Sequence, residues 1–320
     1  MFQMPAVLAE RASRDRGADG GDWIRQLPDI ITEAQHRWSL SLEAVLPLGK
    51  ELSVLVAVTM PGGQPAVLKA SYPDARPRRE AAALARWAGH GAATLLGADP
   101  GRGLLLLERL APDRSLLAED DTQALLIAAD TLQQLWVPPH LEDSIPPTAD
   151  LARRWLTLIP GRYRALGRPF EPRLLDAALA ASNGLARAPR KPVLLHGDFH
   201  RGNVLASVRA SWLAIDPCPL VGDAEFDVAD LVADLLDDYI GESAAPVRLR
   251  TALSALSAAI PHLSRQRVLH WMLAKRVRLA LNSVGATGNG DWDLDFARLL
   301  LSHQAELTTA LPYPETKEIC

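Results

Sequence analysis

The sequence predicts an α+β fold with two lobes, a small lobe built on an antiparallel sheet and a larger, mainly helical lobe. The chain has 320 residues, which exceeds the usual span of one simple core. Runs of β-prone residues joined by a turn lie in its first third, and segments with helical periodicity follow. We therefore expect residues 1–108 to form an N-terminal extension and the small lobe, and residues 109–320 to form the large lobe.

The small lobe is expected to start with a helix and a strand pair. Residues 22–38 have helical composition, and we expect this helix to be interrupted at Pro28 and to pack on the small lobe. Residues 52–58 and 66–70 are β-prone, and Pro61-Gly62-Gly63 between them is typical of a hairpin turn.

A helix and a further strand complete the small lobe. Residues 79–87 have helix-forming composition, with Glu80 near the start. Residues 104–108 form an apolar strand that leads into a connection at Glu108, Arg109 and Leu110. In the large lobe, helical periodicity is clear over 123–135 and 149–159, and a proline-rich connector, 137–147, joins them.

The most informative segment runs from Val193 to Pro217. It places Asp198 and Asn203 five residues apart in a loop between two apolar runs, and Asp216 at the end of the next apolar run. This layout suits phosphoryl transfer: Asp198 can accept a hydrogen bond from an attacking hydroxyl, and Asn203 and Asp216 can bind a magnesium ion that also contacts nucleotide phosphates. A hairpin turn at 206–211 would bring Asn203 and Asp216 to one end of neighbouring strands.

A lysine and a glutamate supply a second part of a phosphate site. Lys69 ends an apolar strand, where an unpaired charge would be unfavourable, and a compact ammonium suits a phosphate contact. Glu80, eleven residues later, is placed to pair with it. The alternatives are a lysine that extends from an edge strand to solvent and a solvent-facing helix acid.

Together these residues follow the order of the protein-kinase-like fold. His196-Gly-Asp198 and Ile215-Asp216-Pro217 resemble the motifs of aminoglycoside phosphotransferases. The longer string from Trp212 to Asp227 resembles the aminoglycoside 6-phosphotransferases, which include the streptomycin 6-kinases, and their hydroxyurea-kinase relatives, and these families confer antibiotic resistance.

The resemblance implies an activity and a role for each site residue. It implies a small-molecule kinase that uses ATP, with GTP as the open alternative, and Mg²⁺. Asp198 would be the catalytic base, Asn203 and Asp216 the metal ligands, and Asp227 a buried acid that braces the catalytic loop. Lys69, Glu80, Glu108 and Leu110 would form the nucleotide site. The substrate implied is a cationic aminoglycoside such as streptomycin, phosphorylated on a hydroxyl.

Two segments depart from the family pattern. Residues 47–53, where a phosphate-covering turn is expected, contain only one glycine. Cys218-Pro219 stands where Lys-Gly is expected, so the substrate assignment is less secure. We expect Cys218 to be buried, with a reactive thiol as the alternative.

Acidic residues after the metal-binding motif suggest where a cationic substrate would bind. Asp227, Asp230, Asp234 and Asp238 recur at three- and four-residue steps in one predicted helix, where like charges repel and a cationic partner would relieve the repulsion. Glu225, Asp230 and Asp234 of this segment are the expected substrate contacts. A solvated acidic face is the alternative. Near the C-terminus, the three aspartates at 291, 293 and 295 are expected to cap a helix over 294–307, although Trp292 among them would also suit a guanidinium.

Composition narrows the partners and the location. A net charge of −4 argues against nucleic acid and is compatible with a cationic substrate. Two cysteines provide no disulfide framework, and no apolar run reaches the ~20 residues of a membrane span. We therefore expect a cytoplasmic protein with no membrane partner.

Three alternatives to an aminoglycoside kinase remain open. A kinase for another small substrate, such as hydroxyurea, would use the same reaction. A non-catalytic nucleotide-binding sensor could retain the fold, although the full set of kinase residues counts against it. A metallohydrolase would need His196, Asp198 and His200 on one face of a strand, whereas Gly197 and Gly202 favour a loop.

Overall fold

The computed structural model describes residues 6–47, 51–140, 144–187 and 191–308. The chain forms two compact units, one of Met1–Asp113 with Leu205–Cys218, the other of Arg114–Val204 with Pro219–Cys320. The predicted lobe boundary at residue 108 stays a prediction. The two compact units have other boundaries, because the first also contains Leu205–Cys218.

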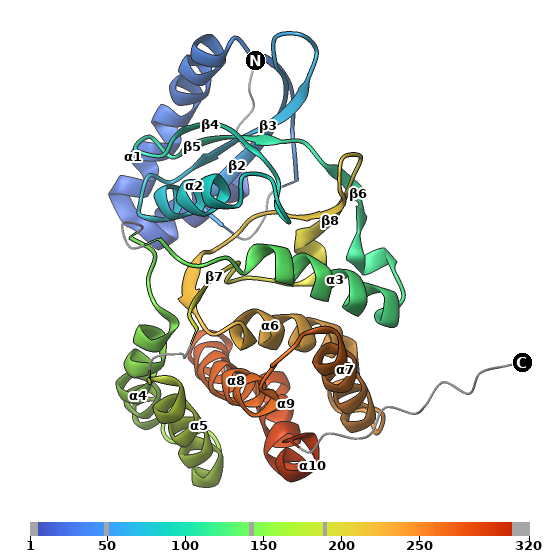
Figure 1. The fold of residues 1–320 in the computed structure, drawn as a ribbon. Coiled ribbons are helices and arrows are strands. Elements are labelled where there is room, and N and C mark those ends of the chain that lie inside the picture. Colours follow the sequence, from blue (N-terminus) through green and yellow to red (C-terminus); the bar gives the residue numbers. More distant parts are fainter. Residues whose placement is uncertain (1–5, 48–50, 141–143, 188–190, 309–320) are drawn as a thin grey trace, which may run out of the picture. The chain divides into compact units, whose positions relative to one another are not determined.

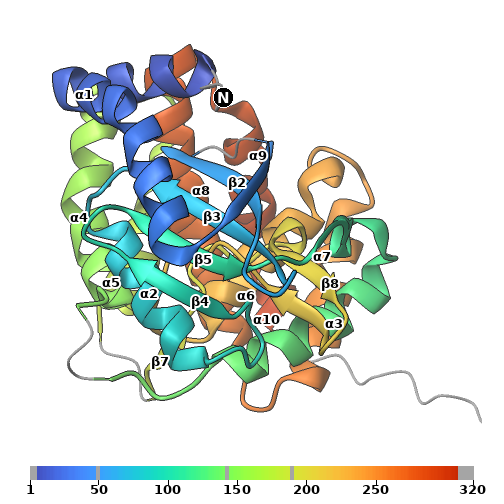
Figure 2. The same cartoon turned by 90° about the horizontal axis from the view of Figure 1, so that it is seen from above.

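A five-stranded antiparallel sheet forms the centre of the first unit (Figure 1). Its order is β1-β2-β3-β5-β4, and Figure 2 shows β2, β3, β5 and β4 side by side in that order. The β2–β3 hairpin is confirmed, since Met60 N–H donates to Gln64 O at 2.8 Å across the predicted turn. The strands are β1 (Ser41–Val45), β2 (Ser53–Thr59), β3 (Pro65–Ser71), β4 (Leu95–Asp99) and β5 (Leu104–Glu108).

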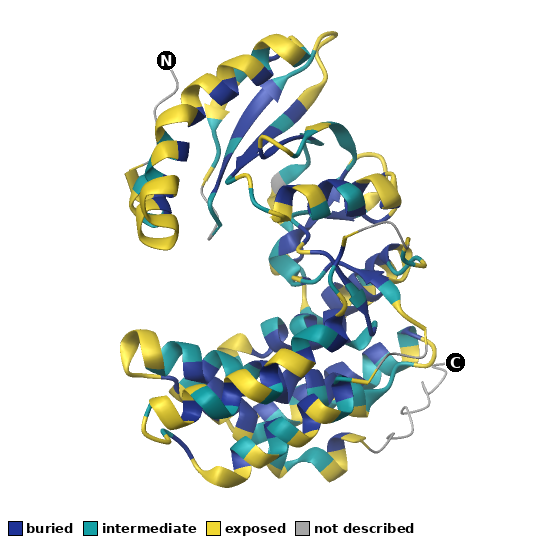
Figure 3. Ribbon diagram, turned by 90° about the vertical axis from the view of Figure 1, so that its left-hand side faces the viewer, coloured by how far each residue is buried: buried dark blue, intermediate teal, exposed yellow. Residues whose placement is uncertain are grey.

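Helix α1 (Ala6–Trp38) covers one face of this sheet. Leu27 and Ile31 of α1 form one apolar cluster with strand residues such as Leu68 and Leu106. Figure 3 shows the buried and exposed faces of this helix. The predicted packing of the N-terminal extension is therefore confirmed.

The predicted interruption of α1 at Pro28 is wrong. Pro28 lies inside the helix, and the non-helical residue is Gly17, with φ 58°. Pro28 is exposed, whereas its neighbours Leu27 and Ile30 are buried, so packing of the inner face holds the helix through the proline.

Side chains of β3 point alternately to the two faces of the sheet, and this alternation determines the face on which Lys69 lies. Ala66, Leu68 and Ala70 belong to the cluster with α1, so Lys69 points to the opposite face. Helix α2 (Arg76–Trp87) contributes Glu80 on that side.

The second unit is mainly helical. Its longest helix, α8 (Arg265–Thr287), packs against α4, α5, α6 and α9. Trp271 of α8 makes edge-on contacts with Trp155 of α4 and Phe226 of α6, at centroid distances of 5.8 and 5.0 Å. The helices are α3 (Asp121–Leu135), α4 (Thr148–Ala165), α5 (Pro172–Leu185), α6 (Glu225–Leu235), α7 (Ala245–Ala259), α8, α9 (Asp291–Ser302) and α10 (Gln304–Thr308).

Short strands carry the segments of greatest functional interest. β7 (Val193–Leu195) pairs antiparallel with β10 (Leu220–Gly222) in the second unit. A three-stranded sheet has the order β6-β8-β9, with β6 (Ala111–Ser115), β8 (Val204–Ser207) and β9 (Ser211–Ala214), so the predicted hairpin at 206–211 is confirmed. The antiparallel sheet followed by helices confirms the predicted α+β class.

Candidate functional site

Lys69 is buried between two carboxylates in the first unit. Its side chain is 3% exposed, and Nζ lies 2.9 and 2.8 Å from the oxygens of Glu80 and 2.5 Å from Oδ1 of Asp216. Burial alone would lower the pKa of Lys69, but Glu80 and Asp216 outweigh burial and raise it, so the ammonium stays charged. The structure brings these three predicted residues together, and it excludes the alternatives of a solvent-directed lysine and a solvent-facing Glu80.

Asp216 has a strained backbone and an accessible carboxylate. Its φ is 55°, a left-handed value that non-glycine residues rarely adopt, and its side chain is 43% exposed. Strain of this kind costs about 1–3 kcal/mol and persists only where the surroundings hold the residue in place.

Arg209, in the turn between β8 and β9, holds this region of the first unit together. Its guanidinium donates to both carboxylate oxygens of Glu108, at 2.8 Å each for the shortest contacts. It also donates to the carbonyl oxygens of Gly89 at 2.7 Å and Ala92 at 3.0 Å. No sequence pattern marks Arg209, because it lies in an exposed turn and its partners are about a hundred residues away in sequence.

Backbone hydrogen bonds extend this contact toward Asp216. Ala93 N–H donates to Ala214 O at 2.9 Å, and Ala214 N–H donates to Gly91 O at 2.8 Å. Ala214 is two residues before Asp216. The side-chain and backbone contacts therefore fix both ends of β9 against segment 89–94.

Glu108 and Leu110, the two residues predicted to contact the nucleotide near the end of β5, have different surroundings. Glu108 accepts hydrogen bonds from Arg209 and from Thr94 N–H, the latter at 2.9 Å, so its carboxylate has a structural task. Burial would raise the pKa of Glu108, but the hydrogen bonds from Arg209 and Thr94 outweigh burial and lower it. Leu110 is half-buried in the connection between β5 and β6. Their nucleotide contacts stay predictions.

Asp227 binds the backbone of the loop that carries Asp198. The Asp227 carboxylate accepts hydrogen bonds from His196 N–H at 3.0 Å, Gly197 N–H at 2.8 Å and Trp136 Nε1–H at 3.1 Å. Asp227 is fully buried, and burial raises its pKa to about 6 against these three donors. Its predicted bracing role agrees with this geometry, and Asp198 itself is exposed.

Asn203 and Asp216 have the donor chemistry that magnesium prefers. Asn203 is 8% exposed, and its Nδ2 donates to Asp198 O at 3.0 Å, which leaves the amide oxygen for a cation. An amide oxygen and an ionised carboxylate are hard ligands of the kind that Mg²⁺ takes. The residues therefore fit the ion, and their assignment as its ligands stays a prediction.

The histidines of the loop have local structural roles. His200 Nδ1 accepts from Gly202 N–H at 3.2 Å, and the His196 ring is buried edge-on against Phe199. Gly197 has φ 82°, which breaks the strand alternation that a metal site would need. Among the residues that the structure describes, no three His, Cys, Asp or Glu side chains are grouped to hold a metal. The donor geometry does not support a metallohydrolase.

The acids of α6 differ in their partners. Asp230 pairs with Lys275 at 2.7 Å, and Asp234 pairs with Arg201 at 2.8 Å. Glu225 accepts Ser264 N–H at 3.0 Å. Much of the expected charge repulsion is thus relieved inside the protein, and the substrate roles of Asp230 and Asp234, like that of Glu225, stay predictions.

Two smaller expectations concern Cys218 and the phosphate-covering turn. Cys218 is exposed, so the expectation that it is buried is wrong; Pro217 and Pro219 on either side of it are buried instead. Residues 48–50 of the expected turn lie outside the described residues.

In the described ranges, no helix is both long and apolar enough to cross a membrane.

Comparisons with known proteins show the family of the chain. The model of the aminoglycoside/hydroxyurea antibiotic resistance kinases matches residues 37–284. A streptomycin 6-kinase of Streptomyces glaucescens is 33% identical over 303 residues, which cover 94% of this chain and 96% of that protein. A hydroxyurea phosphotransferase of Kitasatospora aureofaciens is 33% identical over 88% of this chain and 80% of that protein.

Solved structures identify the fold. A macrolide 2'-phosphotransferase from Brachybacterium faecium, 17% identical, has a TM-score of 0.56 over 85% of this chain and 97% of that one. The fold is therefore that of the protein-kinase-like small-molecule kinases, as predicted, and the activity of the family is phosphoryl transfer from a nucleotide. The chain belongs to the aminoglycoside/hydroxyurea antibiotic resistance kinase family.

Proposed function

We propose that this protein transfers the γ-phosphate of ATP to a hydroxyl of a small cationic aminoglycoside, and that streptomycin, phosphorylated at its 6-hydroxyl, is the substrate. The observation that carries phosphoryl transfer is the contact of Lys69 with both Glu80 and Asp216. It joins the residue suited to nucleotide phosphates to the acid suited to the metal. The choice of streptomycin rests on the relatives that act on it.

Each residue has a defined task in this proposal. Asp198 orients the acceptor hydroxyl and takes its proton, and Lys69 contacts the α and β phosphates. Asn203 and Asp216 hold Mg²⁺, which when bound neutralises charge on the phosphates. The protein thus contributes alignment and electrostatic stabilisation and forms no covalent intermediate. In this proposal the reaction takes place in the cytoplasm.

A second candidate is a hydroxyurea kinase, favoured by the 33% identity to a hydroxyurea phosphotransferase. One experiment separates the candidates. The protein is mixed with Mg²⁺, with ATP or GTP, and with streptomycin, other aminoglycosides or hydroxyurea, and ADP or GDP release is followed. Streptomycin should stimulate release at least tenfold over the rate without acceptor, and mass spectrometry and NMR should locate one phosphate on the 6-hydroxyl. Stimulation by hydroxyurea alone would contradict the first candidate.

A further inference from the structure

Trp136 is the side-chain donor in the set of three N–H groups that holds Asp227. The other two donors are the backbone groups of His196 and Gly197, which any residue except proline would supply. The Trp136 indole and the His196 N–H share one carboxylate oxygen, at 3.1 and 3.0 Å, and the Gly197 N–H binds the other at 2.8 Å. Both oxygens thus accept hydrogen bonds, and Trp136 supplies the one bond that depends on residue type.

Backbone contacts fix Trp136 beside β7, the strand before His196. Trp136 ends α3, and its backbone N–H donates to Leu132 O at 3.0 Å. The next residue, Val137, accepts the N–H of Leu194 in β7 at 2.9 Å. The indole N–H is therefore presented from a backbone that is tied to both α3 and β7.

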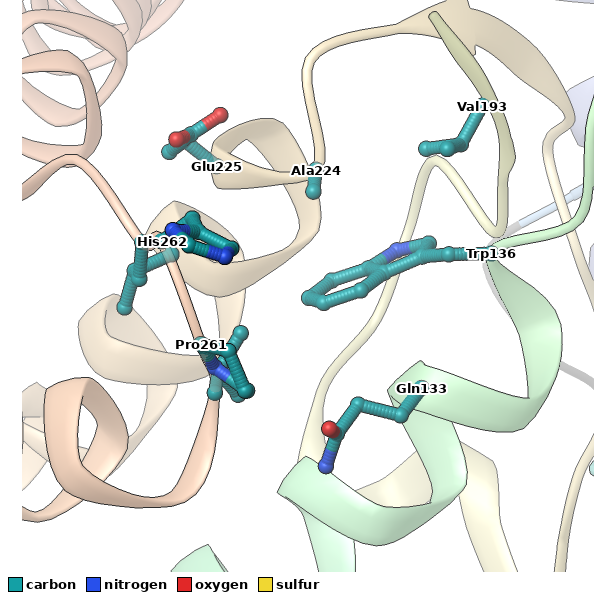
Figure 4. A pocket seen from close by; sticks show the side chains of 9 residues that line it. Gln133, Trp136, Val193, Ala224, Glu225, Pro261 and His262 are labelled. Carbon is teal, nitrogen blue, oxygen red and sulfur yellow. The ribbon is translucent and has the colours of Figure 1, made fainter. Parts of the chain in front are cut away.

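The indole of Trp136 also forms one side of a pocket of about 320 Å³ in the second unit (Figure 4). Pro261 and His262 lie on the opposite side, and Val193 of β7 belongs to the lining. Trp136 itself is half-buried. A smaller ring at this position would leave space that joins the pocket and not a closed cavity in the core, so we expect such a variant to fold.

Hydrogen bonds, and not a cation, compensate the charge of Asp227. Within the described part of the chain Asp227 forms no ion pair, and of the charged groups around it, Asp230 on α6 and Lys275 on α8 pair with each other at 2.7 Å. The titratable ring of His196 is buried in the loop. Burial raises the pKa of Asp227 to about 6 against its three N–H donors. Since each oxygen accepts at least one N–H, protonation of either oxygen places a hydrogen against a donor and breaks a contact.

We propose that Trp136 is a positioning residue for phosphoryl transfer: its indole N–H keeps the Asp227 carboxylate in place, and this carboxylate holds the backbone that presents Asp198. The inference goes beyond the proposed function and rests on its assignment of Asp198 as the base. Asp198 directly follows Gly197, so a shift of the Gly197 backbone would move the base relative to an acceptor hydroxyl. Trp136 should therefore affect kcat and leave nucleotide affinity unchanged.

Trp136→Phe removes the N–H and keeps an aromatic ring. Without this donor the pKa of Asp227 should rise above neutral, so kcat at neutral pH should fall about tenfold while KM for magnesium ATP stays unchanged. Near pH 9 the carboxylate is ionised again, and kcat of the variant should come within about threefold of the unmodified protein. Trp136→His carries an N–H at the equivalent position of its five-membered ring, so it should retain most of kcat at neutral pH.

Trp271→Phe is the matched control. Trp271 donates its indole N–H to another buried carboxylate of the second unit, that of Asp223, at 3.2 Å, and Asp223 pairs with Arg267. This variant should lower the free energy of unfolding without a pH-dependent loss of kcat. Equal losses of kcat in the two variants, or a loss in Trp136→Phe that persists near pH 9 and in Trp136→His, would reduce Trp136 to a packing role and overturn the inference.

NMR tests the contact in the unmodified protein and without turnover. The indole N–H resonance of Trp136, assigned by its loss in Trp136→Phe or Trp136→His, should move between about pH 4 and about pH 8 with a midpoint of about 6. In Asp227→Asn it should stay constant, because the amide does not titrate. A resonance that is constant in both proteins would overturn the inference.

The outcomes separate this inference from the proposed function. Full turnover in Asp198→Asn, with a Trp136 resonance that titrates, would contradict the proposed base and leave the hydrogen bond to Asp227 in place. An inactive Asp198→Asn, with kcat of Trp136→Phe equal to that of the unmodified protein at each pH, would overturn the positioning role of Trp136 and leave the proposed function standing.

Discussion

Asp227 and Asp234 lie seven residues apart on α6, and each carboxylate holds a different part of the loop that carries Asp198. Asp227 accepts the N–H groups of His196 and Gly197 before Asp198, and Asp234 accepts the backbone N–H of Arg201 after it, at 3.1 Å. Seven residues make about two helical turns, so both acids lie on one face of α6. The helix therefore fixes the loop on both sides of Asp198.

Asp198→Asn tests the catalytic base. The amide cannot take the proton of the acceptor hydroxyl, so kcat should fall on the order of a hundredfold or more, while the affinity for magnesium ATP changes little. Steady-state kinetics and calorimetric titration of the nucleotide check the two parts. Turnover close to that of the unmodified protein would remove Asp198 from the mechanism.

The two predicted metal ligands should respond differently. Asp216→Ala should abolish magnesium-dependent nucleotide binding, because it removes a carboxylate that would hold the ion. Asn203→Ala should reduce kcat more than affinity. Titration of ATP with and without Mg²⁺ measures both effects. If Asp216→Ala binds magnesium ATP as tightly as the unmodified protein, the ligand assignment is wrong.

Arg209→Ala tests whether the β8–β9 turn positions Asp216. The variant loses the hydrogen bonds to Glu108, Gly89 and Ala92, so Asp216 should be held less firmly in its strained conformation. We expect the Kd for magnesium ATP to rise about tenfold, or ~1.4 kcal/mol. Arg209→Lys should not restore affinity, since an ammonium cannot reproduce the fork of a guanidinium.

The control for Arg209 is Arg102→Ala in the same unit. Arg102 pairs with Glu33 on the surface, and both side chains are more than 40% exposed. Exposed pairs contribute about 0–1 kcal/mol, so this variant should leave nucleotide affinity unchanged. Equal losses in the two variants would show that removal of any arginine pair weakens binding, and Arg209 would have no positioning role.

Local chemistry in the sequence predicted much of the fold and part of the site. Three predictions depend only on neighbours in sequence, and the structure agrees with them. They are the hairpin at Gly62-Gly63, the apolar strand that ends at Lys69 and the loop around Asp198. Asp227 was assigned through the family motif. The metal and nucleotide roles stay predictions.

Features that depend on distant partners could not be predicted. Repulsion among the acids of α6 suggested an external cation, but Lys275 lies 45 residues from Asp230 in sequence and supplies the charge. Arg209 reaches Glu108 across 101 residues. The path of α1 through Pro28 depends on its buried face against the sheet, which outweighs the local tendency of proline to break a helix.

Asp227 should make stability depend on pH in a predictable direction. Its pKa is raised from 3.8 to about 6 by burial, so between these values the unfolded chain binds fewer protons than the folded one. The contribution of Asp227 to the free energy of unfolding is therefore fully present below about pH 4 and is lost as pH rises through about 6. Two pKa units correspond to about 3 kcal/mol.

Asp227→Asn isolates this effect because the amide does not titrate. Urea unfolding of both proteins from about pH 3.5 to about pH 7 gives the difference in unfolding free energy, in which the other groups cancel. The advantage of the unmodified protein over the Asp227→Asn variant should shrink as pH rises and level off above about pH 6. An advantage that grows with pH would mean that the three N–H donors outweigh burial and lower the pKa of Asp227.

Asp230→Asn distinguishes an internal ion pair from a substrate acid. Lys275 is 9% exposed, lies over the Phe226 ring, and donates to both oxygens of Asp230 at 2.7 Å. The variant leaves this ammonium buried without its counter-charge, so we expect a loss of about 3 kcal/mol in unfolding free energy and no change in KM for streptomycin. The double variant Asp230→Asn with Lys275→Met should recover most of that loss, because it removes the uncompensated charge. Urea unfolding and steady-state kinetics measure the two quantities on the same samples. A tenfold rise in KM at unchanged stability would instead make Asp230 a substrate contact.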